Sequence, residues 1–376
     1  MAEIEIKNSK FYNVFTEVFK KLLSNNIVEA VLVPQEMSGN VVQTLVSESD
    51  SLKKINSLAP VLPVNSARIV SKLTIKDFYP VKNNISNERG EKIAVMLRPC
   101  EIRALIELVK LKQAKIDNVL VIGIDCFGTY SVNDYVAKNK ELNGDGAVTA
   151  DFIKKVQTNQ EIKELRTACQ LCRHFVPENS DIAVNLIGTD WNQKIVIQAR
   201  NEKGKKVLEE LKLEDAPENK ERKLAVEQEK EKRKKQKGKI EKEDIDFLQV
   251  ISSLCINCQN CRSVCPICYC KECVFEGEIF EYSKQKYLTW AKRKGLLKMP
   301  TDMLLFHLTR MSHVLTSCVA CGQCEAACPN KIPLGRIYHH LSNEVQKMLD
   351  YEAGRKLDEE LPLSAFKEDE LQTIES

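Results

Sequence analysis

Residues 255–266 read CINCQNCRSVCP, and residues 318–329 read CVACGQCEAACP. Both segments follow the Cys-x2-Cys-x2-Cys-x3-Cys-Pro pattern that binds [4Fe-4S] clusters. In such a pair, the first three thiolates of one segment share a cluster with the fourth thiolate of the other. The pattern therefore predicts two clusters, one bound by Cys255, Cys258, Cys261 and Cys328 and the other by Cys318, Cys321, Cys324 and Cys265.

Two structural zinc sites are the alternative interpretation, because zinc also binds Cys-x2-Cys pairs. Zinc needs only four ligands in two pairs, which leaves the third evenly spaced cysteine and the trailing Cys-Pro of both segments unexplained. Clusters are therefore the favoured interpretation. Three further cysteines cannot complete another cluster and receive no assigned role; a tight turn packed against cluster sulfur is expected for Cys268, Cys270 and Cys273.

The overall charge gives no electrostatic argument for a nucleic-acid or membrane partner. The 376 residues include 56 Lys and Arg against 53 Asp and Glu, a formal net charge of +3. No signal peptide and no apolar run of about 20 residues is visible, so a cytoplasmic protein without a membrane span is expected. In such a chain, fifteen cysteines indicate metal binding rather than disulfides.

The first half of the chain has the alternating patterns of an α/β domain. Apolar residues recur at helical spacing over residues 11–23, and a strand pattern follows at residues 27–33. A strand at 92–97, a helix after Cys100 and a strand at 119–124 form a βαβ unit. The two strands of this unit are expected to be parallel.

Four cysteines of this domain are candidates for a third cluster. Cys100 and Cys126 follow neighbouring parallel strands, at the edge where open α/β sheets bind cofactors. Cys100 also begins a helix, whose N-terminal dipole favours an anionic group. Buried structural cysteines are the competing interpretation, and the Cys-x2-Cys pair of Cys169 and Cys172 makes it less favoured.

Composition divides the chain into four parts. Residues 1–200 form the α/β domain, and residues 201–246, rich in charges of alternating sign, are expected to be a solvated helical linker. Residues 247–345 hold both cysteine segments, and residues 346–376 are a polar tail. The helical stretch between the two segments is too long for a compact ferredoxin, so an all-α helical ferredoxin domain is predicted. Its His307 and His313 are expected to be packed or surface residues, because the clusters are already fully ligated.

The helical domain resembles the iron-sulfur subunits of succinate dehydrogenase and of the heterodisulfide reductase family. Three motifs of the first domain, MLRPCEI at 96–102, GIDCFGT at 123–129 and RTACQLC at 166–172, resemble another family. It is the beta-subunit family of deazaflavin (coenzyme F420) hydrogenases and formate dehydrogenases, and the resemblance covers about the first two hundred residues. A two-cluster domain at the C-terminal end is similar to the formate dehydrogenase beta subunits in particular.

The resemblance implies a bound flavin. In this family the domain binds FAD together with a [4Fe-4S] cluster, and the flavin exchanges a hydride with the deazaflavin coenzyme. Residues 97–101 read LRPCE where the family usually has GTPCQ, which leaves the roles of Arg98 and Glu101 open. By analogy with the family, the candidate FAD contacts are Asn65, Ser66, Arg68 and Arg98.

These observations predict an electron-transfer subunit with FAD and three [4Fe-4S] clusters. The flavin is the reactive group, converting a two-electron hydride donor into single electrons, which clusters carry one at a time. The hydride carrier is expected to be coenzyme F420 or NAD(P), although no Gly-x-Gly-x-x-Gly marks a dinucleotide site. The expected partner is a formate dehydrogenase, a hydrogenase or a heterodisulfide-reductase-like complex. The alternative is a passive relay or docking subunit without flavin.

Overall fold

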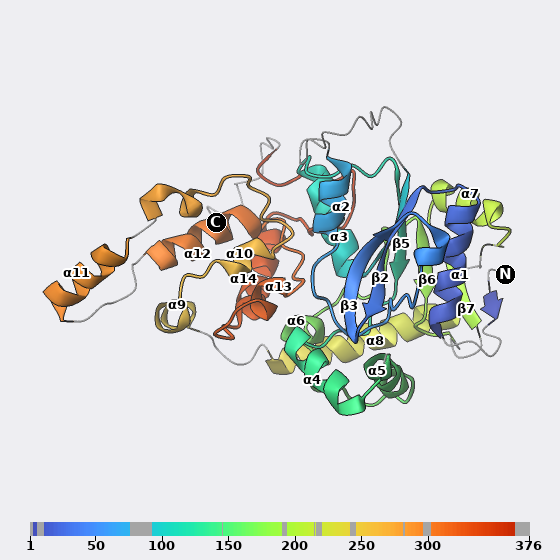
Figure 1. The fold of residues 1–376 in the computed structure, drawn as a ribbon, viewed down its shortest axis with the longest axis horizontal. Coiled ribbons are helices and arrows are strands. Elements are labelled where there is room, and N and C mark those ends of the chain that lie inside the picture. The colour runs from blue at the N-terminus through green and yellow to red at the C-terminus, as the bar shows by residue number, and fades with distance from the viewer. Residues whose placement is uncertain are drawn as a thin grey trace.

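A computed structural model describes residues 3–5, 11–75, 92–144, 146–189, 194–213, 215, 220–240, 246–280, 283–295 and 302–364. Two bodies lie side by side in it: a sheet flanked by helices, and a helical body formed by the later part of the chain (Figure 1). This arrangement confirms the predicted order of an α/β domain followed by a helical ferredoxin-like region. The division of the chain at residues 200, 246 and 345 remains a prediction.

Seven strands of the described residues form one mixed sheet in the order β1-β7-β6-β5-β4-β2-β3. The central strands β6, β5, β4 and β2 are parallel, which confirms the predicted βαβ unit, whereas β7, β1 and β3 pair antiparallel at the edges. The strands are β1 (Glu3–Glu5), β2 (Ala30–Met37), β3 (Asn40–Val46), β4 (Ile93–Leu97), β5 (Val119–Ile124), β6 (Ile182–Asn185) and β7 (Lys194–Ala199).

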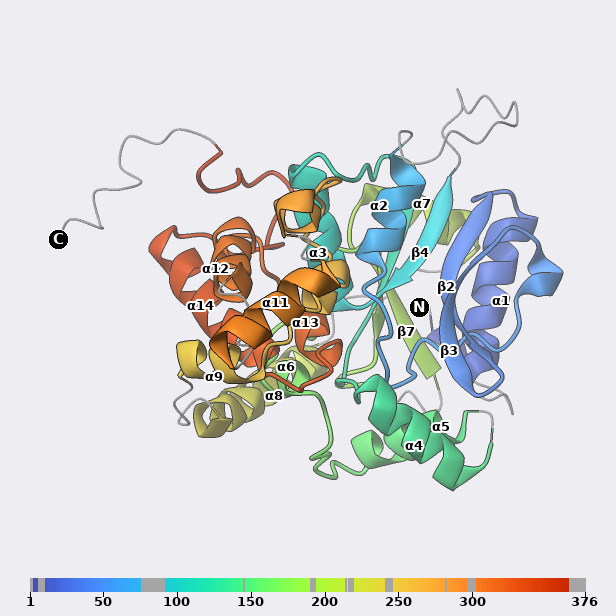
Figure 2. The ribbon, with the colours of Figure 1, turned by 60° about the vertical axis from the view of Figure 1, so that its left-hand side comes forward.

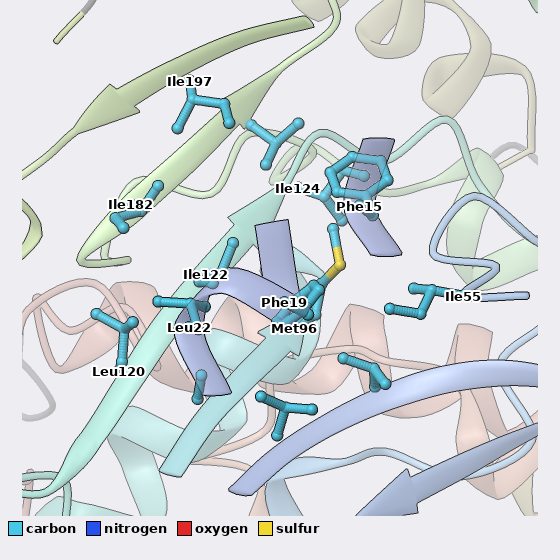
Figure 3. Packing of buried hydrophobic residues seen from close by; sticks show 14 of the residues in the cluster. Phe15, Phe19, Leu22, Ile55, Met96, Leu120, Ile122, Ile124, Ile182 and Ile197 are labelled. Carbon is cyan, nitrogen blue, oxygen red and sulfur yellow. The ribbon is translucent and has the colours of Figure 1, made fainter. Parts of the chain in front are cut away.

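Helices cover both faces of this sheet (Figure 2). On one face, Phe15, Phe19 and Leu22 of α1 pack over Met96 of β4 and Ile122 of β5 (Figure 3). Helix α7 lies on the same core, and α2 and α3 cover the other face. The helices of this body are α1 (Phe11–Ser24), α2 (Ala67–Thr74), α3 (Pro99–Lys110), α4 (Val132–Leu142), α5 (Ala147–Gln157), α6 (Thr167–Gln170) and α7 (Glu202–Glu210), with a 3-10 turn η1 (Ser49–Ser51).

The helical body packs around a core of its own, which includes Phe306, Met311, Ile337 and Tyr338. Within the described ranges, no helix is both long and apolar enough to cross a membrane. The elements of this body are α9 (Phe247–Leu254), α10 (Asn260–Ser263), η3 (Val274–Glu276), η4 (Glu278–Phe280), α11 (Lys284–Lys294), α12 (Asp302–Val314), α13 (Gln323–Ala326) and α14 (Leu334–Met348).

The charged segment between the two bodies forms one long helix, α8 (Lys220–Ile240), which runs along the lower side of the α/β body (Figure 1). Its helical state agrees with the sequence prediction. The expectation of a solvated helix is wrong for Arg222 and Arg233, whose exposed fractions are 8% and 9%. Composition alone did not reveal this docking, because both buried residues are arginines and the apolar pattern that normally marks a packed face is weak.

The two bodies are joined through the second cysteine segment. Val319 belongs to the same apolar core cluster as α3, and Cys321 packs against that cluster. The Gln323 side-chain amide donates a hydrogen bond to the Leu62 carbonyl at 2.8 Å. Gly322, at φ +70°, lies so close to α6 that a Cβ atom there would collide with the Cβ of Ala168. Only glycine combines this positive φ with so close an approach.

Replacing Gly322 by alanine tests this junction, and Gly295→Ala is a matched control. Both glycines have positive φ, +70° and +66°, but no atom of the described residues lies within 4 Å of a Cβ at Gly295. The left-handed backbone should lower the free energy of unfolding of both variants by about 1–2 kcal/mol. Overpacking should lower that of Gly322→Ala by a further ~1–3 kcal/mol. Urea unfolding of both variants measures the difference; equal losses would contradict the described contact.

Candidate electron-transfer site

Two cavities in the helical body are each lined by one of the predicted cysteine sets. The Cys255 cavity is lined by Cys255, Cys258, Cys261 and Cys328. The Cys318 cavity is lined by Cys318, Cys321, Cys324 and Cys265. The fourth cysteine of each segment thus sits in the other segment's cavity, as two interleaved clusters require. This geometry supports the predicted ligand sets, which stay a prediction.

The two cysteine loops have the same backbone design. Asn257 and Gln259 of the first loop have positive φ, and Ala320 and Gly322 have it at the equivalent positions of the second. A short helix starts directly after each loop, α10 after Gln259 and α13 after Gly322. Alternating left-handed and right-handed residues curl a backbone tightly and turn its N–H groups inward, a geometry that suits anionic groups. In the described part of the chain, no three or more His, Cys, Asp or Glu side chains are placed so that they could hold a metal ion.

The four remaining predicted ligands come together at the edge of the sheet. Cys100 begins α3, Cys126 follows β5, and Cys169 and Cys172 lie in and just after α6. Burial raises the pKa of Cys100, Cys126 and Cys172, and the neighbouring thiols raise it further. One arginine, Arg233, reaches the carbonyls of both Cys126 and Cys172, and Cys172 lines one cavity with Pro99, the neighbour of Cys100, so the structure brings these cysteines to one edge of the sheet.

Cys169 differs from the other three thiols. Burial would raise its pKa, but the charge of Arg166 and a hydrogen bond with Thr129 outweigh burial, and the pKa lies below its ordinary value. Arg166 Nη2 is 3.6 Å from the Cys169 sulfur, and Arg166 Nε donates to Thr129 Oγ1 at 2.8 Å. The site therefore favours a thiolate at Cys169, the form in which cysteine binds metal.

Two further arginines surround this site, and sequence reasoning missed both. Arg233 of α8 lies over the Phe175 ring at 4.2 Å and reaches the Cys126 and Cys172 carbonyls at 3.2 and 3.4 Å. Arg103 of α3 lines one cavity with Cys172, and burial lowers the pKa of Arg103. Arg103 could have been predicted, because it stands three residues after Cys100 and therefore on the same side of a helix. No sequence feature near Arg233 indicated that it lies at the cysteine site. Positive charges in a poorly solvated site favour an anionic group there.

Helix α8 is fixed over this site by a buried ion pair. Arg222 Nη1 and Nη2 donate to the two oxygens of Asp125 at 2.6 and 2.9 Å. The same carboxylate accepts from the Leu186 and Ile187 backbone N–H groups at 2.8 and 2.9 Å. Asp125, 1% exposed, precedes the predicted ligand Cys126, so the pair couples the position of α8 to the cysteine site.

The predicted FAD contacts lie near the carboxyl ends of β4 and β5, but only Arg98 lines a cavity there, together with Gln43 and Met96. Asn65 and Ser66 are fully buried nearby, and Arg68 is half-buried on α2. Within the described residues, four buried atoms around this place have no hydrogen-bond partner: Gln43 Oε1, Asn65 Nδ2, Ser66 Oγ and Arg98 Nη1. Buried polar groups are normally satisfied, so these atoms offer hydrogen bonds to a polar group, whereas the cavity by Arg98, about 10 Å³ in this structure, is too small to hold a whole flavin.

The structure gives Glu101, whose role was open, a structural task. Its carboxylate accepts from the Arg98 backbone N–H at 2.9 Å and caps the start of α3. It also accepts from the Ser66 N–H at 2.8 Å. Glu101 therefore ties two of the predicted FAD contacts to the turn that carries Cys100.

The histidines of α12 are packed or exposed, as predicted. His313 is exposed, whereas His307 is 1% exposed and places Nε2 3.5 Å from the Cys255 sulfur. Burial, with Arg310 nearby, lowers the pKa of His307 to about 4, so its ring is neutral at neutral pH.

The three cysteines without an assigned role differ in their surroundings. Cys268 lies beside Cys265 and Arg310, Cys270 is exposed, and Cys273 packs on the core of the helical body. Cys268 packs on the same core, which also holds Cys261, and the expected turn packed against cluster sulfur stays a prediction.

Two cysteine-lined cavities in a helical body, attached to an α/β body with a third cysteine group, define an iron-sulfur protein of the oxidoreductase class. Residues 251–332 match the family model described as 4Fe-4S dicluster domain. Residues 90–225 match the model for the C terminus of the coenzyme F420 hydrogenase/dehydrogenase beta subunit. The resemblance predicted from the motifs is thereby confirmed: residues 90–225 are similar to the C-terminal domain of the coenzyme F420 hydrogenase/dehydrogenase beta subunits.

Relatives of known function are similar along nearly the whole chain. The F420-dependent formate dehydrogenase subunit beta of Methanocaldococcus jannaschii is 28% identical over 92% of this chain and 92% of its own length. The F420-dependent formate dehydrogenase 1 subunit beta of Methanococcus maripaludis is 28% identical over 92% of this chain and 91% of its own.

A solved structure, of the F420-reducing [NiFe] hydrogenase complex from Methanosarcina barkeri, contains a chain 13% identical to this one. The match covers 65% of this chain and 87% of that chain, with a TM-score of 0.38, too low to establish a shared fold.

Substituting Arg222 by methionine tests the anchor of α8. The change leaves the buried Asp125 carboxylate without its partner, which should lower the free energy of unfolding by ~3–5 kcal/mol. Lys230→Met is the control on the same helix, since its pair with Glu227 is exposed and should be worth under ~1 kcal/mol. Urea unfolding of both variants compares them; a similar small loss in both would disprove a buried anchor.

Proposed function

We propose that this chain is the electron-transfer beta subunit of an F420-dependent formate dehydrogenase, with FAD and a [4Fe-4S] cluster in the α/β body and two [4Fe-4S] clusters in the helical body. Its task is to join a two-electron hydride carrier to one-electron chemistry in a partner subunit. The observation that carries the proposal is the placement of the three cysteine sets one after another through the molecule.

The sets adjoin across the junction of the two bodies. Cys321 of the Cys318 cavity packs against the apolar cluster of α3, and its neighbour Gly322 lies against Ala168, the neighbour of Cys169. Helix α10, which holds Cys261 of the Cys255 cavity, contacts α13, which holds Cys324 of the Cys318 cavity. A cluster bound at each set would therefore have a neighbour one step away, which is the arrangement that stepwise electron transfer needs.

The end of this series in the α/β body is the place for the flavin. The buried unpaired atoms of Asn65, Ser66 and Arg98 lie by the turn that carries Cys100, and Glu101 links that turn to Ser66. When bound there, FAD would supply the conversion between a hydride and two single electrons. The residues of this chain would hold and orient the flavin next to the third cysteine set.

The other end of the series is the exit toward a catalytic partner. Cys258 of the Cys255 cavity is exposed, so a cluster there would lie near the surface. The names of the two relatives favour formate dehydrogenase as the partner and coenzyme F420 as the carrier. NAD(P), a hydrogenase and a heterodisulfide-reductase-like complex stay predictions from the sequence.

Iron, acid-labile sulfide and flavin per chain, measured on protein isolated without oxygen, test this proposal. Three cubanes require about twelve iron atoms, and one FAD is expected with them. Cys169→Ala should lower the iron content to about eight atoms, because it removes a ligand of the third cluster only. Cys270→Ala is the control, since this exposed cysteine has no assigned ligand role.

Two results would overturn parts of the proposal. About eight iron atoms and no flavin in the unmodified protein, the content of two clusters alone, would leave a relay subunit. Zinc in place of iron would reject electron transfer altogether. With flavin present, reduction by the deazaflavin coenzyme but not by NADH or NADPH identifies the carrier.

A further inference from the structure

We propose that Arg310 and Arg166 are shared counter-ions, one at each junction between successive clusters, and that each raises the reduction potential of the clusters on both sides of it. The inference rests on the proposed function, because it concerns the clusters that the three cysteine sets would bind. It assigns roles to two residues outside the ligand sets.

Arg310 is a buried cation with unsatisfied hydrogen-bonding groups. It projects from α12, is 4% exposed and lies over the Tyr338 ring at 4.5 Å. Among the described residues, its Nε and Nη1 atoms have no hydrogen-bond partner, and no carboxylate pairs with it. An uncompensated charge in such a place is strongly destabilising, so an anion belongs beside it.

The groups around Arg310 identify that anion. Arg310 lines the Cys318 cavity. Cys265 and Cys324 line the same cavity. One turn earlier on the same helix, His307 lines the Cys255 cavity, so the part of α12 that carries Arg310 lies at both cysteine sets. Anionic clusters in both sets would supply the negative charge that the protein itself does not.

Arg166 has the corresponding place at the other junction. It hydrogen-bonds Thr129 through Nε, and its buried Nη1 atom has no hydrogen-bond partner in the described residues. Its Nη2 atom is 3.6 Å from the Cys169 sulfur, and its Nη1 atom is 4.0 Å from the position of a Cβ at Gly322, the neighbour of Cys321 of the Cys318 cavity. The close approach of Gly322 to Ala168 brings the helical body within reach of Arg166.

The electrostatic effect has a definite sign. Each electron that a cluster accepts adds one negative charge, and a fixed positive charge nearby stabilises the reduced form. Poor solvation strengthens this effect, and arginine stays protonated at every accessible pH. The potential of a neighbouring cluster therefore rises, and the cluster in the Cys318 cavity feels both arginines.

A redox titration of the intact protein, followed by electron paramagnetic resonance, tests this assignment with Arg310→Gln and Arg166→Gln. The first change should lower the potentials of the two clusters in the helical body and leave the third cluster unchanged. The second should lower those of the third cluster and the Cys318-cavity cluster. Cys169→Ala, which lacks the third cluster, assigns the signals. Arg293→Gln, which removes an exposed arginine of α11, should shift none of them.

Lysine variants separate charge from shape and cover the case in which a glutamine variant fails to hold its iron. Arg310→Lys and Arg166→Lys keep the positive charge, so the neighbouring potentials should stay near those of the unmodified protein. The inference is overturned if glutamine variants with full iron content leave the potentials in place, or if lysine lowers them as much as glutamine does. Either result leaves the proposed function standing, because that proposal fails on the iron and flavin content instead.

Discussion

The close contact between the loop of residues 318–324 and the edge of the α/β body is the constraint on which the arrangement of this protein depends. Gly322 permits that contact, since a side chain there would collide with Ala168. The loop contributes Val319 to the core beneath α3 and Cys321 to the neighbourhood of Cys100. A single glycine thus allows two separately built bodies to present their cysteines to one another, and the proposed electron path exists only while that contact is kept.

The sequence predicted the parts of this protein that local patterns determine. The cysteine segments are recognisable because three ligands of each predicted cluster lie close together in the sequence. The strands of the βαβ unit are recognisable as short apolar runs. The docking of α8 could not be predicted, because Arg222 meets Asp125 and Arg233 meets Phe175 from far along the chain. The cavity by Arg98 and the unpaired atoms around it likewise become visible only when distant segments are brought together.

Three arginines of this protein differ in the partners of their positive charges. Arg222 has a full carboxylate partner, whereas Arg310 has none among the described residues and Arg166 is directed to a cysteine. A buried ion pair is weak evidence of stability, but its loss on one side is costly. The paired arginine serves to hold a helix, and the unpaired ones lie where sulfur ligands gather. The partners of these arginines distinguish their roles: Arg222 holds a helix in place, whereas Arg310 and Arg166 are the proposed counter-ions of the clusters.

The segment that follows α14 returns to the start of the protein. The Ala353 carbonyl accepts two hydrogen bonds from Arg103, and the Gly354 N–H donates to Glu107, across sequence separations of 250 and 247 residues. The Tyr351 hydroxyl donates to the same glutamate. On the ribosome, α3 cannot acquire these partners until residues 351–354 have emerged. Arg103 and Glu107 of α3 therefore stay without these partners while the residues between them and Tyr351 are being synthesised.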